Sequence, residues 1–298
     1  MELEFLGTGT SHGVPVIGCN CEVCKSSDLK NNRMRSSAYI KTSDDTRILI
    51  DCGPEFRIQA LRSNINKIDA LLMTHSHADH LLGIDDLRIF SCVLSHKPDS
   101  PESKNCYAPP LPLYSNKNTL DDIQRRFDYI FEPAKSGGGH ANIQLIEAKA
   151  PFTINKTIVT PILIMHGKLP VCGWLISEEN PEKPGNIKER HSIAYLTDLN
   201  FISEKSIDLI NQFSGNLEHV VIDGLREKVH ETHFCFLEAM ELASKLNAKH
   251  VWLTHFTHEK THQQICDYLE AHKKDFAGLE NCVSVLPAYD GLKICTEN

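Results

Sequence analysis

Apolar positions along the chain fall into two patterns, short continuous runs and stretches with helical spacing, which alternate over much of its length. The short runs predict strands at 2–6, 37–42, 47–51, 69–74, 143–148, 157–165, 172–177, 192–197, 218–223 and 250–254. The helical spacing predicts helices near 55–63, 83–94, 118–128, 203–212, 235–247 and 260–271. Polar stretches at 95–112, 135–142 and 177–191 predict loops, the last as the tip of a long hairpin. Apolar runs resume on both sides of each loop, so we expect an α/β fold in one domain over 1–298, with two sheet-forming halves.

Many of the predicted strands run directly into a histidine or an aspartate. The strand-end residues of this kind are Asp51, His75, His166, Asp198, Asp223 and His255. Ligands of open α/β sheets bind beyond the carboxyl ends of the strands, so the set predicts one polar edge. A capping turn explains any single aspartate equally well, but it does not explain the whole set.

Composition and charge narrow the function classes. The chain has 298 residues, of which 41% are hydrophobic, enough for a full core, and its net charge is −8. This charge argues against a broad electrostatic grip on nucleic acid, which needs a basic face. No apolar run reaches the roughly 18 residues of a membrane span, and no signal peptide is expected from the first residues. The 11 cysteines, an odd number without secretory context, predict reduced thiols or metal ligands in a cytoplasmic protein.

The segment after the strand at 69–74 carries the densest set of coordinating side chains. It reads H-x-H-x-D-H and contains His75, His77, Asp79 and His80. Alternate residues of an extended segment point the same way, so the first two histidines can bind one ion, while the last two residues can reach a second. Imidazoles with one or two carboxylates suit zinc, iron or manganese. Two divalent cations about 3.5–4 Å apart can activate water and clamp an in-line displacement, so the segment predicts a hydrolytic metal centre.

This motif resembles the signature of the metallo-β-lactamase superfamily, and the resemblance extends over nearly the whole chain. The segments ILIDCG, IMHG, LTD and LTH follow in the order known from the family. The resemblance implies a four-layer αβ/βα sandwich with two metal ions in the active site, and Asp51 as the residue that orients a ligand histidine. Histidine rather than glutamate at position 77 favours hydrolysis over redox chemistry. The implied ligands are His75, His77 and His166 for the first metal, Asp79, His80 and His255 for the second, and Asp198 as the bridge between them.

A second group of metal-binding residues lies near the start of the chain. The segment GCNCEVC places Cys19, Cys21 and Cys24 in a C-x-C-x-x-C pattern, which predicts three corners of a structural zinc site. We expect His258 to be the fourth ligand. Three reduced thiols in a loop are the competing interpretation. The alternative fourth ligands are Cys52 and His12.

The two metal patterns together resemble the PhnP-type cyclic-phosphate phosphodiesterases. The segments that carry this resemblance are LGTGTSHGVPVIGCNCEVC, THSHADH, HGKLPVCGWLI and LTHFTHE. Enzymes of this type open a cyclic phosphoribosyl phosphate, and they bind a structural zinc through the three cysteines and a histidine just after the last active-site ligand. This chain departs from them in length, chiefly through 95–112 and 178–190, so the chemistry carries over more directly than the substrate.

Phosphodiester hydrolysis needs a proton donor for the leaving alkoxide, and histidine is the usual donor near neutral pH. His233 precedes the helix predicted at 235–247 and matches the PhnP-type pattern, so we expect it to be the general acid, with His230 as the alternative. Asp79 is expected to be catalytic beside it. Asp223 can orient this loop or simply form a turn. Candidate cations for the substrate phosphate are Lys168, Arg33 and Arg35.

The sequence therefore favours a metal-dependent phosphodiesterase that acts on a small cyclic or diester phosphate. It would hold two active-site ions, zinc or manganese, and one structural zinc. The first alternative is a tRNA 3′-processing endoribonuclease, against which the acidic charge argues, and the second is a thioester or lactone hydrolase. We expect a small phosphodiester as the substrate partner, no nucleic acid, no membrane, and a second copy of the chain as a candidate partner in a homodimer.

Overall fold

The computed structural model describes residues 1–91, 109–132 and 140–297, and it contains two mixed β-sheets. The first sheet has the spatial order β15-β1-β2-β3-β4-β5-β6. Its first neighbours pair antiparallel and its last three pairs, from β3 to β6, are parallel. Its strands are β1 (Glu2–Gly7), β2 (Ser37–Lys41), β3 (Arg47–Ile50), β4 (Ala70–Leu72), β5 (Leu111–Ser115), β6 (Ile143–Glu147) and β15 (Lys293–Cys295).

The second sheet has the spatial order β11-β8-β9-β10-β12-β13-β14, and β7 pairs with β8 beside this path. Strands β8, β9 and β10 pair antiparallel, whereas β10, β12, β13 and β14 run parallel. Its strands are β7 (Phe152–Ile154), β8 (Thr157–His166), β9 (Leu169–Glu178), β10 (His191–Leu196), β11 (Phe201–Ile202), β12 (Asn216–Asp223), β13 (His250–Thr254) and β14 (Ser284–Pro287).

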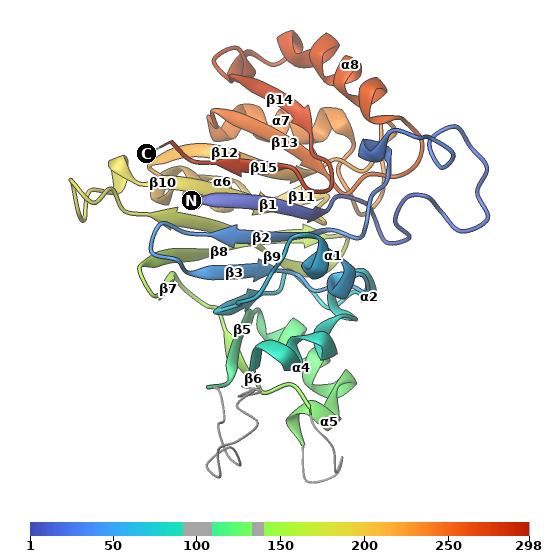
Figure 1. Cartoon of the computed structure of the whole chain (residues 1–298). Coiled ribbons are helices and arrows are strands. Elements are labelled where there is room, and N and C mark those ends of the chain that lie inside the picture. The colour runs from blue at the N-terminus through green and yellow to red at the C-terminus, as the bar shows by residue number, and fades with distance from the viewer. Residues whose placement is uncertain (92–108, 133–139, 298) are drawn as a thin grey trace.

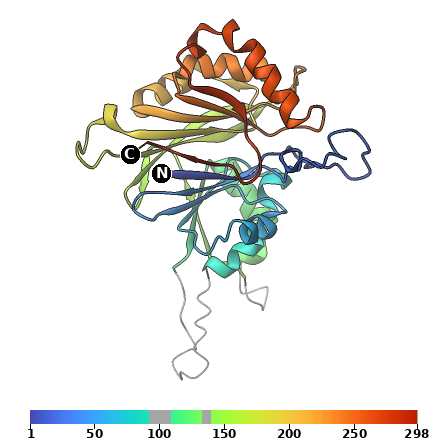
Figure 2. The same cartoon turned by 45° about the horizontal axis from the view of Figure 1, so that its top comes forward.

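The two sheets pack face to face, and helices cover the outer face of each (Figure 2). The apolar layer between the sheets includes Phe5, Ile48, Trp174 and Tyr195. A second layer lies under α6 (Glu204–Phe213), α7 (Phe236–Leu246) and α8 (His262–His272), and a third lies under α1 (Phe56–Arg62), α4 (Lys117–Arg126) and α5 (Asp128–Phe131). This is the αβ/βα sandwich that the resemblance predicts, so the predicted fold class is confirmed.

Several elements differ from the sequence-based expectation. The last two residues of the loop predicted at 95–112 belong to β5. The N–H of Leu111 donates to Asn142 O, and Tyr114 O accepts from the N–H of Met73. Pro112, which has no N–H, lies between these two bonded positions. Of this predicted loop, 95–108 lies outside the described residues, as does 135–139 of the loop at 135–142. The described part of the helix predicted at 83–94 is split, because a 3-10 turn at Ile84–Leu87 precedes the short α3 (Arg88–Ser91), and 92–94 lie outside the described residues.

The short strands β7, β11, β14 and β15 were not predicted, because two to four residues give too little apolar pattern to recognise. The predicted hairpin tip at 177–191 is confirmed, since β9 and β10 pair antiparallel on either side of it. In the part of the chain that the structure describes, no helix combines the length and apolar character needed to cross a bilayer.

Candidate active site

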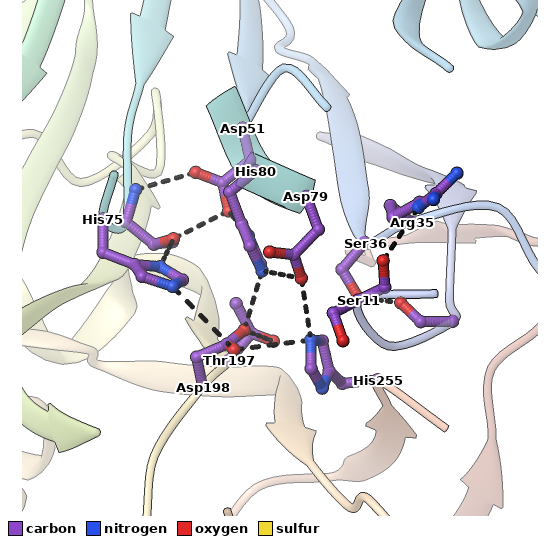
Figure 3. Close-up of polar contacts among 12 residues, drawn as sticks. Ser11, Arg35, Ser36, Asp51, His75, Asp79, His80, Thr197, Asp198 and His255 are labelled. Carbon is purple, nitrogen blue, oxygen red and sulfur yellow. Dashed lines mark hydrogen bonds and ion pairs between the residues drawn. The ribbon is translucent and has the colours of Figure 1, made fainter. Parts of the chain in front are cut away.

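The carboxyl ends of strands from both sheets converge on one polar cluster. The predicted strand-end residues lie at the carboxyl ends of β3, β4, β8, β10, β12 and β13: His166 and Asp223 close their strands, and the others follow within three residues. Three of them, Asp51, Asp198 and His255, have φ angles of 58°, 58° and 66°. This left-handed region is uncommon for residues other than glycine, and such residues cluster at functional sites. The backbone therefore turns sharply at three strand ends whose side chains meet in Figure 3.

The H-x-H-x-D-H segment changes conformation halfway. His77 is extended, with φ −65° and ψ 153°, and it caps the short helix α2 (Ala78–Leu81), which contains Asp79 and His80. A Cβ atom at Gly53 would lie only 2.1 Å from the Asp79 carbonyl oxygen, so glycine is what allows the turn after β3 to approach this helix. The extended half and the helical half thus present their side chains in different directions, as the spacing predicts.

Asp198 lies at the centre of the cluster (Figure 3). Its Oδ2 atom is 3.1 Å from His80 Nε2, and its Oδ1 atom is 3.4 Å from His255 Nε2 and 4.0 Å from His75 Nε2. Asp79 Oδ2 is 3.3 Å from His80 Nε2 and 3.8 Å from His255 Nε2. The structure thus brings all predicted active-site ligands together in overlapping groups, which are His75–His77–His166, His75–His80–Asp198 and Asp79–His80–His255.

The donor atoms of this cluster fit divalent cations. The Nε2 atoms of His75, His80 and His255 are buried, and none makes a hydrogen bond of normal geometry with the described residues, although Asp198 lies within 4.0 Å of each. Buried polar atoms without a partner are rare and commonly mark an ion or a water. Burial, together with the nearby His80, holds the pKa of His75 well below its ordinary value. Burial alone would raise the pKa of Asp198, but the surrounding histidines hold it well below its ordinary range. Neutral imidazole and ionised carboxylate are the forms that bind metal.

Outer residues orient the ligand histidines. His80 Nδ1 is 2.7 Å from Asp51 Oδ2, which is the role that the resemblance implies for Asp51. Asp51 also accepts bonds of 2.8 Å from the backbone N–H and the hydroxyl of Thr74, and this hydroxyl lies 3.0 Å from His75 Nδ1. The other orienting contact comes from a carbonyl: His166 Nδ1 donates to Thr232 O at 2.7 Å. Thr74 and Thr232 were not anticipated from the sequence.

His233 lies beside the cluster with its own carboxylate partner. Its Nδ1 atom is 2.6 Å from Asp223 Oδ2, and its ring stacks on the ring of His255 with centroids 4.8 Å apart. Burial alone would lower the pKa of His233, but Asp223 and Asp198 raise it to about 9. The ring of His230 lies farther out, 5.3 Å from His233. Asp223 therefore does more than close a turn, because it holds the imidazole that borders the candidate metal ligands.

The three predicted cysteines surround His258. The Nδ1 atom of His258 is 3.4 Å from the sulfurs of Cys19 and Cys21 and 3.5 Å from that of Cys24. A tetrahedral zinc with Zn–S of about 2.3 Å and Zn–N of about 2.0 Å holds sulfur and nitrogen about 3.5 Å apart. The backbone N–H of Cys24 and the ring of His258 lower the pKa of Cys21 to about 6, which favours the thiolate. The four side chains therefore have the spacing of a tetrahedral site.

Neither alternative fourth ligand belongs to this group of four side chains. Cys52 is fully buried in the apolar layer under α1, and the ring of His12 packs edge-on against His258 with centroids 5.7 Å apart.

The three candidate phosphate cations have different surroundings. Arg33 is wrong for this role, because it is buried and donates to the Thr8 hydroxyl at 2.9 Å and to Ala288 O at 2.8 Å. Arg35 donates to Ser11 O at 3.0 Å and pairs with Glu55, and its side chain lies beside the cluster in Figure 3. Lys168 is exposed in the turn between β8 and β9.

Arg126, at the end of α4, was not recognised from the sequence as a site residue. It donates to Ser76 O at 2.9 Å and pairs with Asp122 at 2.7 Å. Ser76 lies between the first two histidines of the motif, so this arginine fastens the extended half of the H-x-H-x-D-H segment.

Comparison with known proteins agrees with this geometry. A model of the beta-lactamase superfamily domain matches residues 46–256. The crystal structure of a new diphosphatase from the PhnP family has a TM-score of 0.76 and 33% sequence identity, and the match covers 99% of this chain and 98% of that chain. An octanoyltransferase of Porphyromonas gingivalis is 34% identical over 285 residues, 94% of this chain, but the chain spans only 51% of its length. A ribonuclease Z of Prochlorococcus marinus is 28% identical over 200 residues, 65% of this chain and 54% of that protein.

Proposed function

We propose that this chain, which belongs to the beta-lactamase superfamily of metal-dependent hydrolases, is a phosphodiesterase that cleaves a small cyclic or diester phosphate. The observation that carries the proposal is the pair His233–Asp223, an imidazole held at 2.6 Å by a buried carboxylate beside the ligand cluster. The similarity to a PhnP-family diphosphatase supports it, because that enzyme also acts on a phosphate compound. A phosphoribosyl cyclic phosphate is the type of substrate that the resemblance implies.

The proposed metal centre is dinuclear, with zinc or manganese as the candidate ions. Divalent cations in such a centre lower the pKa of bound water and offset the negative charge of a phosphoryl group. Asp198 and Asp79 would supply the carboxylates, and five of the clustered histidines would supply ring nitrogens. The proposed assignment is His75, His77 and His166 for one ion, Asp79, His80 and His255 for the other, and Asp198 between them.

The remaining steps fall to the residues around the cluster. His233 carries the proton for the leaving alkoxide. Asp223 accepts the hydrogen bond from Nδ1 of His233, so Nε2 of His233 is left to reach the substrate. Asp51 holds His80 through Nδ1, and Thr74 holds both Asp51 and His75. These contacts keep the cluster rigid before any substrate binds, which limits reorganisation during the reaction.

A panel of substrates tests the proposed function. Purified protein, loaded with Mn²⁺ or Zn²⁺, is assayed on a five-membered cyclic phosphate, a bis-aryl phosphodiester, a diphosphate, a thioester and a pre-tRNA. We expect the highest kcat/KM on the small phosphodiesters, and no turnover by the same protein after chelation. Preferred processing of pre-tRNA would instead support the endoribonuclease function, which the similarity to ribonuclease Z favours and the net charge of −8 opposes. Preferred hydrolysis of the thioester would overturn phosphodiester chemistry.

A separate structural zinc is proposed at Cys19, Cys21, Cys24 and His258. The double variant Cys21→Ser/Cys24→Ser should contain about one zinc fewer per chain and should unfold at lower temperature, because zinc binding to the folded site stabilises it. Zinc content by elemental analysis and thermal unfolding by circular dichroism measure the two effects.

The matched control removes two thiols outside this group. Cys266→Ser/Cys295→Ser changes the same number of cysteines on α8 and β15, and it should keep the wild-type zinc content. Equal zinc content in both double variants would show that the cysteine group does not bind zinc.

A further inference from the structure

Asn200 lies between two loops of the active site that come from distant parts of the chain. One is the tight turn between β8 and β9, which follows His166 directly, and the other is the segment 224–235 between β12 and α7, which carries His233. We propose that Asn200 is a positioning residue that fastens the loop of the general acid to the turn of the metal-binding histidine. This inference rests on the proposed function, since it assigns a partner to the proposed acid.

The side-chain amide of Asn200 bonds to both loops at once. Its Oδ1 atom accepts a hydrogen bond of 2.7 Å from the backbone N–H of Gly167, and its Nδ2 atom donates one of 2.8 Å to Glu231 O. The backbone N–H of Asn200 donates to Met165 O at 2.8 Å, which holds the asparagine itself on β8. The two contacts need a donor atom and a separate acceptor atom on one short side chain, which the amide of asparagine provides.

Other contacts also hold the two loops together, through atoms other than the side-chain amide of Asn200. His166 Nδ1 donates to Thr232 O at 2.7 Å, so a metal-binding histidine is oriented by a carbonyl of the acid loop. Gly167 has φ of 60°, and a Cβ atom there would lie 3.1 Å from Thr232 Cγ2, so turn and loop are in close contact. Glu231 and Thr232 are the two residues before His233. A shift of Glu231 is therefore passed on to the acid two residues along, whereas His166 keeps its separate bond to Thr232 O.

Other backbone hydrogen bonds hold the loop mainly near its two ends, where Gly224 N–H bonds to Thr254 O and Leu225 N–H bonds to Phe234 O, both at 2.9 Å. The structure assigns no helix or strand between Asp223, where β12 ends, and Phe236, where α7 begins. Its described backbone bonds to the rest of the fold include Phe234 N–H to Leu199 O at 2.7 Å, which fixes the end nearer to α7. Asn200 fixes the preceding residues. A misplacement of about 1 Å at a reacting group can cost about 100-fold in rate, so this contact matters for the proton transfer.

The test compares Asn200→Asp and Asn200→Ala with a matched control. Asn200→Asp keeps the acceptor for Gly167 but loses the donor to Glu231 O, and Asn200→Ala loses both contacts without adding charge. The control is Asn211→Asp on α6, where Nδ2 donates to Lys245 O at 3.3 Å, a contact that involves neither of the two loops. We expect both Asn200 variants to lose about 10- to 100-fold in kcat on an alkyl phosphodiester, the range known for outer-shell partners, with two metals retained.

The loss should be smaller on a diester with a p-nitrophenyl leaving group, which departs without a proton. A variant that was merely less well folded would lose the same factor on both substrates. In the His233→Ala background, Asn200→Asp should add no more than about a twofold loss, the usual error of additivity, because the acid that it positions is already absent. A full additional loss in that background would overturn the inference.

The outcomes separate this inference from the proposed function. If His233→Ala itself shows no dependence on the leaving group, the proposed acid is wrong. If His233→Ala shows the dependence while both Asn200 variants behave like Asn211→Asp, the acid stands and the positioning role of Asn200 is overturned.

Discussion

Replacing Asp198 by alanine is expected to reduce turnover by more than about 100-fold, the upper end of what loss of an outer-shell partner costs. Asp198 is nearly fully buried, and its two carboxylate oxygens face Nε2 of His80 at 3.1 Å and Nε2 of His255 at 3.4 Å. Removal of this carboxylate leaves a group of imidazoles with only Asp79 to offset the charge of two cations. Because Asp198 is the proposed bridge, both ions should bind more weakly, and elemental analysis after dialysis should find fewer than two in the cluster.

A control and a second readout make this expectation specific. Asp208→Ala removes an exposed carboxylate from α6, and it should keep wild-type metal content and turnover. Added metal should raise the unfolding temperature of the wild-type protein and of Asp208→Ala, since a ligand that binds only the folded state stabilises it. The rise should be much smaller for Asp198→Ala. Full occupancy and full activity of Asp198→Ala would show that the cluster does not depend on this carboxylate.

Local sequence patterns were sufficient to predict which side chains gather in the cluster, because several of them lie at strand ends. An apolar run followed at once by His75, His166, Asp198 or His255 could be read one segment at a time. The two sheets then bring these ends together, since β3 and β4 run parallel in the first sheet and β10, β12 and β13 run parallel in the second. Parallel strands present their carboxyl ends at one edge. The H-x-H-x-D-H motif added the remaining ligands, because its spacing places them within a single turn of chain.

The residues around the ligands were harder to predict because their role depends on atoms that sequence patterns do not show. Thr232 acts through its backbone carbonyl, which every residue has, so nothing in its identity marks it. Asn200 bonds to residues 33 and 31 positions away, and a lone asparagine after a strand usually indicates a turn. Thr74 had the clearest signal, since a hydroxyl next to His75 at the end of a buried strand needs a partner.

Arg33 shows the opposite error, in which a charged residue predicted at the site belongs to the core. The polar stretch NNRMRSS indicated exposed arginines. In the fold, the guanidinium of Arg33 packs over the ring of Phe256, 4.4 Å from its centroid, and donates to Ala288 O. Burial lowers its pKa to about 10, so it remains charged at neutral pH. Both partners lie more than 200 positions away, and no local pattern could indicate them.

The other prediction with a large expected effect concerns His233. A positioned general acid typically contributes about 10²–10⁴-fold, so His233→Ala should lose roughly that factor on an alkyl phosphodiester. Metal content should stay at the wild-type level, because the proposed ligands are other residues. The loss should shrink on a p-nitrophenyl diester, whose leaving group is stable without a proton. Rates on both substrates at saturating concentration, measured with the same metal-loaded protein, provide the comparison.

Two further variants distinguish a role of His233 in proton transfer from a structural role. His233→Asn can still donate to the buried carboxylate of Asp223 but carries no proton to transfer, so it should show the same dependence on the leaving group as His233→Ala with less loss of stability. His230→Ala removes the neighbouring ring, 5.3 Å away, and should keep most of the activity on both diesters. Equal losses on the two substrates in both His233 variants would make this residue a structural one. If the dependence on the leaving group appeared in His230→Ala instead, the proton would come from His230, and Asp223 would serve only to hold the loop.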